Sequence, residues 1–216
     1  MGSTRLFFIN GSSELSHCDR PTAPALPVCL PIGAIARSGS YHSQPNFEPL
    51  PMTRFDLTAE GLRAGMRRLA ASVCVITARD SNGQRQAMTA TAVTSVSDNP
   101  ASLLVCVNRQ TTLHTILAAG SSFAVNVLGA HQTDISVQCA SHESGEARFT
   151  SGDWADHHHL PYLKSAQAVF FCNGASQLIH GTHLIVVGNV HDVLVSKEPL
   201  NPLLYANGQY RRLNEA

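Results

Sequence analysis

The chain has 216 residues, of which 44% are apolar and 14% are charged, and its formal net charge at pH 7 is zero. This length and composition support one packed domain with or without a tail, and the missing basic excess argues against a nucleic-acid-binding protein. No apolar run reaches the ~18 residues that a membrane span needs. The six cysteines form no CxxC pair, which argues against a zinc knuckle and indicates a reducing, cytoplasmic compartment.

Residues 1–51 differ from the rest of the chain because they hold seven of the eleven prolines. Each proline removes a backbone donor and fixes φ, so neither helix nor sheet propagates there. We expect a poorly ordered tail, followed by a domain over residues 52–216. Two interpretations of the tail stay open: Met52 is the true initiator, or the segment is a genuine disordered extension. A targeting peptide is disfavoured, because the segment lacks an amphipathic Arg-rich helix.

From Met52 onward, short helical and strand patterns follow one another. Thr58 is suited to cap a helix whose apolar face carries Leu62, Met66 and Leu69. Further helices are predicted at 111–119 and 131–140. Apolar and β-branched runs predict strands at 72–78, 88–97, 102–107, 122–128, 167–172, 177–180 and 184–195.

Turn signals separate these elements, including Asn82-Gly83 and Asp98-Asn99-Pro100. Residues 141–161 are polar and contain glycine, so we expect a long loop of the kind that often carries function. Strands outnumber helices and are joined mostly by short turns. The sequence therefore predicts a mainly β (α+β) fold, a closed or nearly closed antiparallel barrel with a few peripheral helices.

Several nucleotide and catalytic motifs are missing from the sequence. It contains no GxGxxG, no GxxxxGK[ST], no GxSxG and no HExxH, so Rossmann, P-loop, hydrolase-elbow and zincin chemistry lack support. His157, His158 and His159 could bind a metal ion. However, adjacent residues of regular structure cannot all point at one ion, so we expect a solvated loop and no metal site.

The strand predicted at 88–97 carries small side chains on both faces and hydroxyls at Thr89, Thr91, Thr94, Ser95 and Ser97. Small side chains let a flat ligand approach the backbone, and hydroxyls bind polar edges without placing a charge in the core. A Thr-rich strand that faces solvent is the alternative, since threonine favours strands in any case.

Five stretches, 66–77, 88–97, 100–114, 123–128 and 181–190, resemble in their order and spacing the flavin reductase family of the FMN-binding split-barrel fold. The resemblance covers residues 54–213. It implies an antiparallel split β-barrel with Greek-key connections and an NAD(P)H-dependent flavin reductase. Such an enzyme transfers a hydride from NADH or NADPH to FMN or FAD and supplies reduced flavin to a separate monooxygenase component. The alternative is a non-catalytic FMN-binding protein with the same barrel.

The resemblance also implies a homodimer with the flavin near the subunit interface, which the absence of net charge does not oppose. It assigns His183 as the catalytic residue that faces the nicotinamide, and it places Asn108, Arg109 and the helix start near the flavin phosphate, where an arginine favours an anion. The candidate cofactor-binding residues are Thr89, Ala90, Thr91, Ala92, Val93, Thr94, Ser95, Val107, Asn108, Arg109, Thr112, His114, Ala140, Ser141, Arg148, Phe149 and Tyr210.

Residue by residue, plainer roles stay open. Arg109 could be a surface cation, Asn108 a turn residue, and His183 the donor of a hydrogen bond to a carbonyl. Two positions depart from the family pattern: Thr182 stands where relatives often carry Asp, and Pro100-Ala101 stands where they often carry two prolines.

Overall fold

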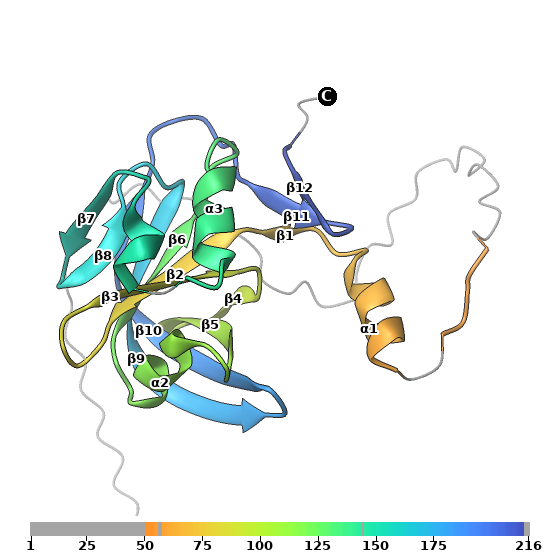
Figure 1. The fold of residues 1–216 in the computed structure, drawn as a ribbon, viewed down its shortest axis with the longest axis horizontal. Helices are drawn as coiled ribbons and strands as arrows, with labels where there is room; N and C mark the ends of the chain where they lie inside the picture. The colour runs from red at the N-terminus through yellow and green to blue at the C-terminus, as the bar shows by residue number, and fades with distance from the viewer. Residues whose placement is uncertain (1–50, 56–57, 144, 214–216) are drawn as a thin grey trace, which may run out of the picture. The chain divides into compact units, whose positions relative to one another are not determined.

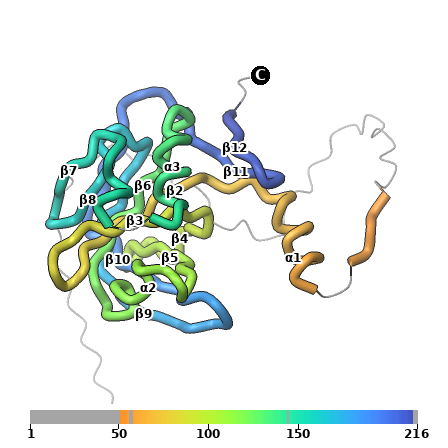
Figure 2. The backbone as a smooth tube through the Cα atoms, in the orientation of Figure 1, coloured from red at the N-terminus to blue at the C-terminus, as the bar shows by residue number. Residues whose placement is uncertain are grey.

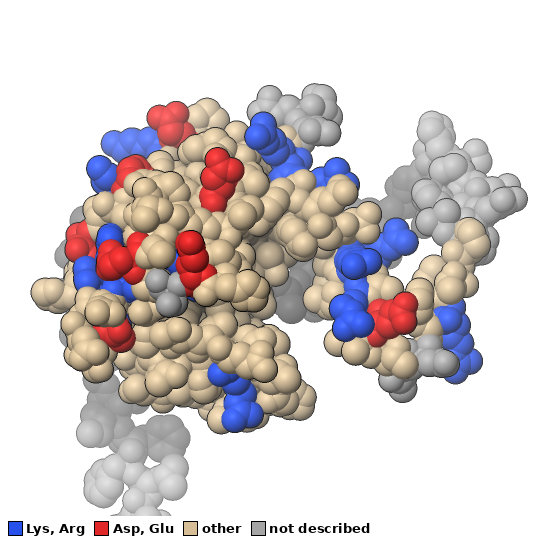
Figure 3. Space-filling view, viewed as in Figure 1, with Lys and Arg blue, Asp and Glu red and all other residues tan. Residues whose placement is uncertain are grey.

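The computed structural model describes residues 51–55, 58–143 and 145–213 (Figure 1). The expectation of a poorly ordered tail over residues 1–51 therefore falls almost entirely outside the described residues. Within them, no helix is both long and apolar enough to cross a bilayer. Figure 3 shows acidic and basic side chains scattered over the face in view, as the zero net charge leads one to expect.

Strands dominate the described part of the chain, and helices are few and short. The helices are α1 (Ala59–Met66), α2 (Thr112–Ala118) and α3 (Thr133–Ala140), with a 3₁₀ turn η1 (Gly145–Phe149). The strands are β1 (Ala71–Ser72), β2 (Cys74–Arg79), β3 (Arg85–Ala90), β4 (Val93–Asp98), β5 (Ala101–Asn108), β6 (Phe123–Val127), β7 (Trp154–His157), β8 (Leu160–Leu163), β9 (Ala168–His180), β10 (His183–Val195), β11 (Leu204–Ala206) and β12 (Gln209–Arg211).

Among the described residues these strands form three sheets, and all their pairings are antiparallel. The main sheet has the order β3-β2-β6-β9-β10-β5-β4, and Figure 2 follows the chain through it. Smaller sheets contain β1-β11-β12 and β7-β8. The mainly β, split-barrel fold with peripheral helices is confirmed.

Apolar side chains pack on both faces of the main sheet, because alternate residues of a strand point to opposite faces. On β2, Ile76 belongs to one core cluster and Val75 to the other. Helix α2 buries Leu113, Ile116 and Leu117 in the first cluster. The second cluster includes Ile135 and Cys139 from α3 and Leu160 and Leu163 from β8.

Predictions for three regions of the chain differ from the structure. The strand predicted at 88–97 is interrupted at Thr91 and Ala92, and its two halves, β3 and β4, pair with β2 and β5 respectively. The loop predicted at 141–161 contains η1 and the β7–β8 hairpin. The two strands predicted at 167–172 and 177–180 are one 13-residue strand, β9, which stays paired with β10 through two register shifts.

Helix α1 begins where predicted, because the Thr58 side chain accepts a hydrogen bond from the Gly61 amide at 3.3 Å. Its predicted apolar face is present, but the described residues leave it uncovered. Leu62 and Met66 are 68% and 55% exposed, and no residue of the helix is buried.

Candidate functional site

The segment that carried the sequence argument links the two end strands of the main sheet, and we call this link the crossing. β3 and β4 lie at opposite ends of the strand order, yet only Thr91 and Ala92 separate them. Both residues are exposed. The sequence predicts that small side chains here let a flat ligand approach the backbone; in the structure the Ala92 carbonyl accepts a hydrogen bond from the Cys106 amide at 3.2 Å.

The crossing divides the predicted flavin-lining residues between two hollows. Thr91, Val93, Thr94 and Ser95 line a hollow of about 620 Å³, the β4 hollow. Its other walls are largely apolar, and Asp98 is the charged residue among its lining side chains. Because it offers no cation, this hollow is unsuited to a phosphate group.

Thr89 instead lines a second hollow of about 360 Å³, the Arg148 hollow, together with four other candidates from distant stretches of sequence. The predicted residues found there are Thr89, Thr112, Ala140, Ser141 and Arg148. They come from β3, from the first turn of α2, from the end of α3 and from η1. The fold thus gathers residues that the resemblance had assigned one by one.

Arg148 is held rigidly in this hollow. Its guanidinium donates to the Ala87 carbonyl and, over 2.7 Å, to the Ser141 carbonyl. Its Nε is buried and has no hydrogen-bond partner among the described residues. A buried donor without a partner is costly unless an acceptor arrives, so the half-buried Arg148 is suited to an anionic or carbonyl-bearing ligand.

A third hollow of about 400 Å³, the Arg109 hollow, is lined by Asn108, Arg109, His114, Gly181 and Thr182. Gln110 lines both this hollow and the Arg148 hollow, so the two adjoin. His114 contributes a second orphan, because its Nε2 is buried and unpartnered within the described residues. The two adjoining hollows therefore contain two arginines, Arg109 and Arg148. They also contain two nitrogen atoms without a hydrogen-bond partner among the described residues, His114 Nε2 and Arg148 Nε.

Asn108 and Arg109 shape the turn that leads into α2. The Asn108 side chain accepts from the Gln110 amide at 2.9 Å, which is the turn role that the sequence left open. Arg109 donates from Nη1 to the Gly181 carbonyl at 3.3 Å, and its backbone amide donates to Thr182 at 2.9 Å. These bonds tie the start of α2 to the β9–β10 turn.

His183 lies at the first position of β10, directly opposite Asn108 of β5. It is exposed, and its Nδ1 is 2.9 Å from the Thr182 hydroxyl. Thr182 itself lines the Arg109 hollow. The predicted catalytic histidine therefore stands beside this hollow, with a neutral hydroxyl as its partner where relatives often place a carboxylate.

Other candidates lie away from these hollows. Ala90 and Val107 are 9% and 0% exposed and pack in the core, and Ala92 lines none of the three. Phe149 is also buried, with its ring edge-on to Trp154 and the Arg85 guanidinium 4.4 Å from its centroid. Tyr210 bonds to the Ser136 hydroxyl at 2.9 Å, and Thr89 donates to the Ser136 carbonyl at 2.7 Å. None of the three hollows is lined by Phe149, Tyr210, Val107 or Ala90. These residues instead pack against the elements that carry the lining residues.

The sequence reasoning missed several lining residues: Met88, Gln110, His142 and Glu143. Gln110 sits between two predicted residues, so its neighbours were the available signal. Cys139 is fully buried, and burial raises the pKa of its thiol to about 12. The thiol therefore stays neutral near pH 7, and the hollow offers binding and orientation but no thiolate nucleophile.

The flavin reductase like domain model matches residues 66–214. This chain belongs to the flavin reductase family. It is 43% identical over 153 residues to the reductase component of the FADH(2)-dependent resorcinol hydroxylase of Rhizobium sp., covering 70% of this chain and 85% of that protein. It is 34% identical to NADH:riboflavin 5'-phosphate oxidoreductase of Streptomyces pristinaespiralis, covering 71% and 85%.

Solved structures agree with this membership. The NADH:FAD oxidoreductase SgcE6 of Streptomyces globisporus superposes with a TM-score of 0.70 at 29% identity, over 76% of this chain and 99% of that one. The same enzyme has been solved with NAD and FAD fragments, with a TM-score of 0.67. This flavin reductase family member is thus an oxidoreductase of the split-barrel fold.

Proposed function

We propose that this protein is an NAD(P)H:flavin oxidoreductase, which transfers a hydride from NADH or NADPH to FMN or FAD. The observation that carries the proposal is the Arg148 hollow, where Thr89, Thr112, Ala140, Ser141 and Arg148 meet. Together with the adjoining Arg109 hollow, its volume falls within the ~300–1,000 Å³ of typical small-molecule sites. The orphaned Arg148 Nε and His114 Nε2 fit a ligand rich in acceptors and donors.

When bound, the flavin accepts the hydride that the reduced nicotinamide gives up. The residues of this chain bind and orient. Arg148 and Arg109 supply positive charge for the phosphate, and the exposed residues Thr91 and Ala92, with no large side chain between them, leave room for a flat ring edge. Much of the rate gain comes from holding two rings in a reactive orientation, so no acid or nucleophile is required of the protein.

His183 is proposed to contact the nicotinamide nucleotide. Its exposure and its place beside the Arg109 hollow support this role. His183→Ala is expected to raise the KM for NADH at least tenfold while the KM for FMN changes less than twofold. The matched control is His180→Ala, since His180 is also exposed and pairs directly with His183 across the β9–β10 turn. Equal losses for both substrates would contradict the assignment.

The protein is further proposed to act as a homodimer. Large apolar side chains are exposed on the β9–β10 arm, among them Leu178, Ile179, Leu194 and Val195. Leu178 and Ile179 lie beside the β9–β10 turn, and Leu194 and Val195 lie at the other end of the strand pair. Exposed apolar surface is typical of association sites. Sedimentation at micromolar concentration is expected to give twice the chain mass of 23.1 kDa. A monomer under these conditions would overturn the dimer but leave the reductase proposal intact.

The acceptor of the reduced flavin is proposed to be a separate monooxygenase component, as the name of the Rhizobium relative indicates for that protein. The activity is tested by a steady-state assay that crosses NADH and NADPH with riboflavin, FMN and FAD. We expect flavin-dependent loss of the reduced-nicotinamide absorbance. Flavin binding without that loss would identify a non-catalytic flavin-binding protein instead.

A further inference from the structure

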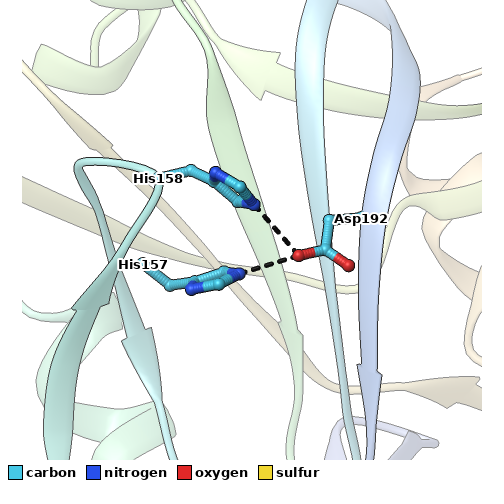
Figure 4. Close-up of side chains that lie close together, drawn as sticks. All are labelled: His157, His158 and Asp192. Atoms are coloured by element: carbon cyan, nitrogen blue, oxygen red, sulfur yellow. Dashed lines mark hydrogen bonds and ion pairs between the residues drawn. The ribbon is translucent and has the colours of Figure 1, made fainter.

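Two histidines and one aspartate converge between the β7–β8 hairpin and strand β10, away from the three hollows described above (Figure 4). The Nε2 atoms of His157 and His158 lie 2.7 Å and 3.0 Å from the same oxygen, Oδ2 of Asp192. All three ligand atoms lie within 4.8 Å of one another. The side chains are between 35% and 47% exposed, so an ion can reach them from solvent.

The convergence of two adjacent histidines has a backbone cause. His157 ends β7, and His158 and His159 form the two-residue turn to β8 with φ of 51° and 62°. In a regular strand the two neighbours would point to opposite faces. The positive φ at His158 removes that alternation, and both rings turn to one side (Figure 4). Two-residue turns of this kind normally use Asn or Gly. The left-handed backbone conformation costs most other residues energy, and here two histidines adopt it.

A bulge in β10 supplies the third group. The pairing of β10 with β9 shifts between Val190 and Asp192, which leaves His191 as the extra residue. Asp192 therefore pairs with Phe171, and its side chain lies on the same face as the Phe171 ring, under the β7–β8 hairpin. His157 and His158 both contact that ring edge-on. Without the bulge, His191 would occupy this position.

Hydrogen bonds and an ion pair from Arg79 stabilise the turn that carries the histidines. Arg79 donates from Nε to the His159 carbonyl at 3.0 Å and from Nη1 to the Gly83 carbonyl at 2.6 Å, and it pairs with Asp156 at 2.6 Å. Its charge is thus engaged and does not compete for Asp192. Bonds of this kind fix the orientation of ligand-bearing residues around metal ions in proteins.

We propose that His157, His158 and Asp192 form a binding site for a divalent transition-metal ion of the zinc type. Two imidazole nitrogens and one carboxylate oxygen make a common ligand set for Zn²⁺. With bonds of ~2.0–2.1 Å, ligand atoms of a tetrahedral site lie ~3.3 Å apart, so the observed 2.7 Å and 3.0 Å need to open by only a few tenths of an ångström. His191, whose ring centroid is 5.1 Å from that of His158, or a water molecule completes the coordination.

The ion would tie together two sheets. His157 and His158 belong to the β7–β8 hairpin, whereas Asp192 belongs to β10 of the main sheet. Because a folded site of this kind is absent from the unfolded chain, bound metal stabilises the fold. The proposal goes beyond flavin reduction and is tested without an activity readout.

The test measures Zn²⁺ binding to the full-length protein by competition with a chromophoric chelator. The wild type is expected to bind one ion that His158→Gln and Asp192→Asn each lose or bind at least tenfold more weakly. His180→Gln, an exposed histidine outside the cluster, is the matched control and should bind as the wild type does. Circular dichroism verifies that each variant is folded.

A second readout uses thermal unfolding. Zn²⁺ is expected to raise the Tm of the wild type and of His180→Gln, but not that of His158→Gln or Asp192→Asn. Equal stoichiometry and affinity in all four proteins would overturn the proposal, as would equal shifts in Tm, because the ion would then be held elsewhere in the chain.

Discussion

Gly188 lies where strand β10 passes the most tightly packed part of the core, and it offers a sharp test of that packing. A Cβ atom added there would lie 2.6 Å from Phe123 Cζ and 2.9 Å from Cys172 Cβ. Ordinary contacts begin at 3.4 Å, so the methyl group would overlap the ring by about 0.8 Å. Phe123 and Cys172 are both fully buried, so neither has room to move aside.

Gly188→Ala is therefore expected to destabilise the protein by ~1–3 kcal/mol, the usual cost of overpacking a core. For a domain of this size, each kcal/mol lowers the Tm by ~2–4 °C. Urea unfolding followed by the fluorescence of the single tryptophan, Trp154, measures the change directly. Gly65→Ala is the control: its Cβ would meet nothing within 4 Å, and because Gly65 lies in helix α1 the substitution should not destabilise the protein and can stabilise it by up to ~1 kcal/mol.

A double-mutant cycle identifies the cause. Phe123→Leu shortens the side chain that the new methyl group strikes, so in that background Gly188→Ala should cost at least ~1 kcal/mol less than in the wild type. Strictly additive effects of the two substitutions would refute the reasoning, because the destabilisation would then come from the backbone at the β10 irregularity and not from the ring.

Three further predictions concern buried polar and ionisable groups. Asn126→Ala removes a side chain that donates to the Val75 carbonyl and accepts from the Leu163 amide, and it should cost ~2–4 kcal/mol in urea unfolding, since both buried partners lose their bond. Burial raises the pKa of Cys74 and Cys172 from 9.0 to about 12, so the folded state disfavours the thiolates and stability should fall as the pH rises from 9 towards 12. Urea midpoints at stepped pH check this, and Cys172→Ala should flatten the fall; a pH-independent midpoint would be the contrary result. Arg148→Lys keeps the charge but not the planar fork, so the KM for FMN should rise at least tenfold; an unchanged KM would remove Arg148 from the site.

Local sequence signals predicted the element starts and turns well. Thr58 and Thr111 cap helices because their hydroxyls accept from amides three residues later, a relation that needs no distant contact. The failures occur where distant partners decide. Residues 88–97 have the composition of a strand throughout. However, the first half pairs with β2 and the second half with β5, and no local sequence signal marks the break between them at Thr91.

The candidate site shows the same division. Arg148 was predicted from its place in a family pattern, and the structure adds what the pattern lacks: its two carbonyl partners and its unused Nε. Val107 alternates with half-buried neighbours on β5, and only the packing places it in the core. The expectation that the consecutive histidines form no metal site rests on regular strand geometry. His158 instead lies in a turn with a positive φ of 51°.

The short link at Thr91 and Ala92 has a consequence for how the molecule is assembled. Its two flanking strands are neighbours in the chain but belong to opposite rims of the main sheet. One rim can form early from the β2–β3 hairpin, whose contacts are local. The other rim, the β4–β5 hairpin, is equally local, but the two rims belong to one sheet only after β6, β9 and β10 have paired between them. We therefore expect closure of the sheet around the Thr91–Ala92 link to be a late step in folding.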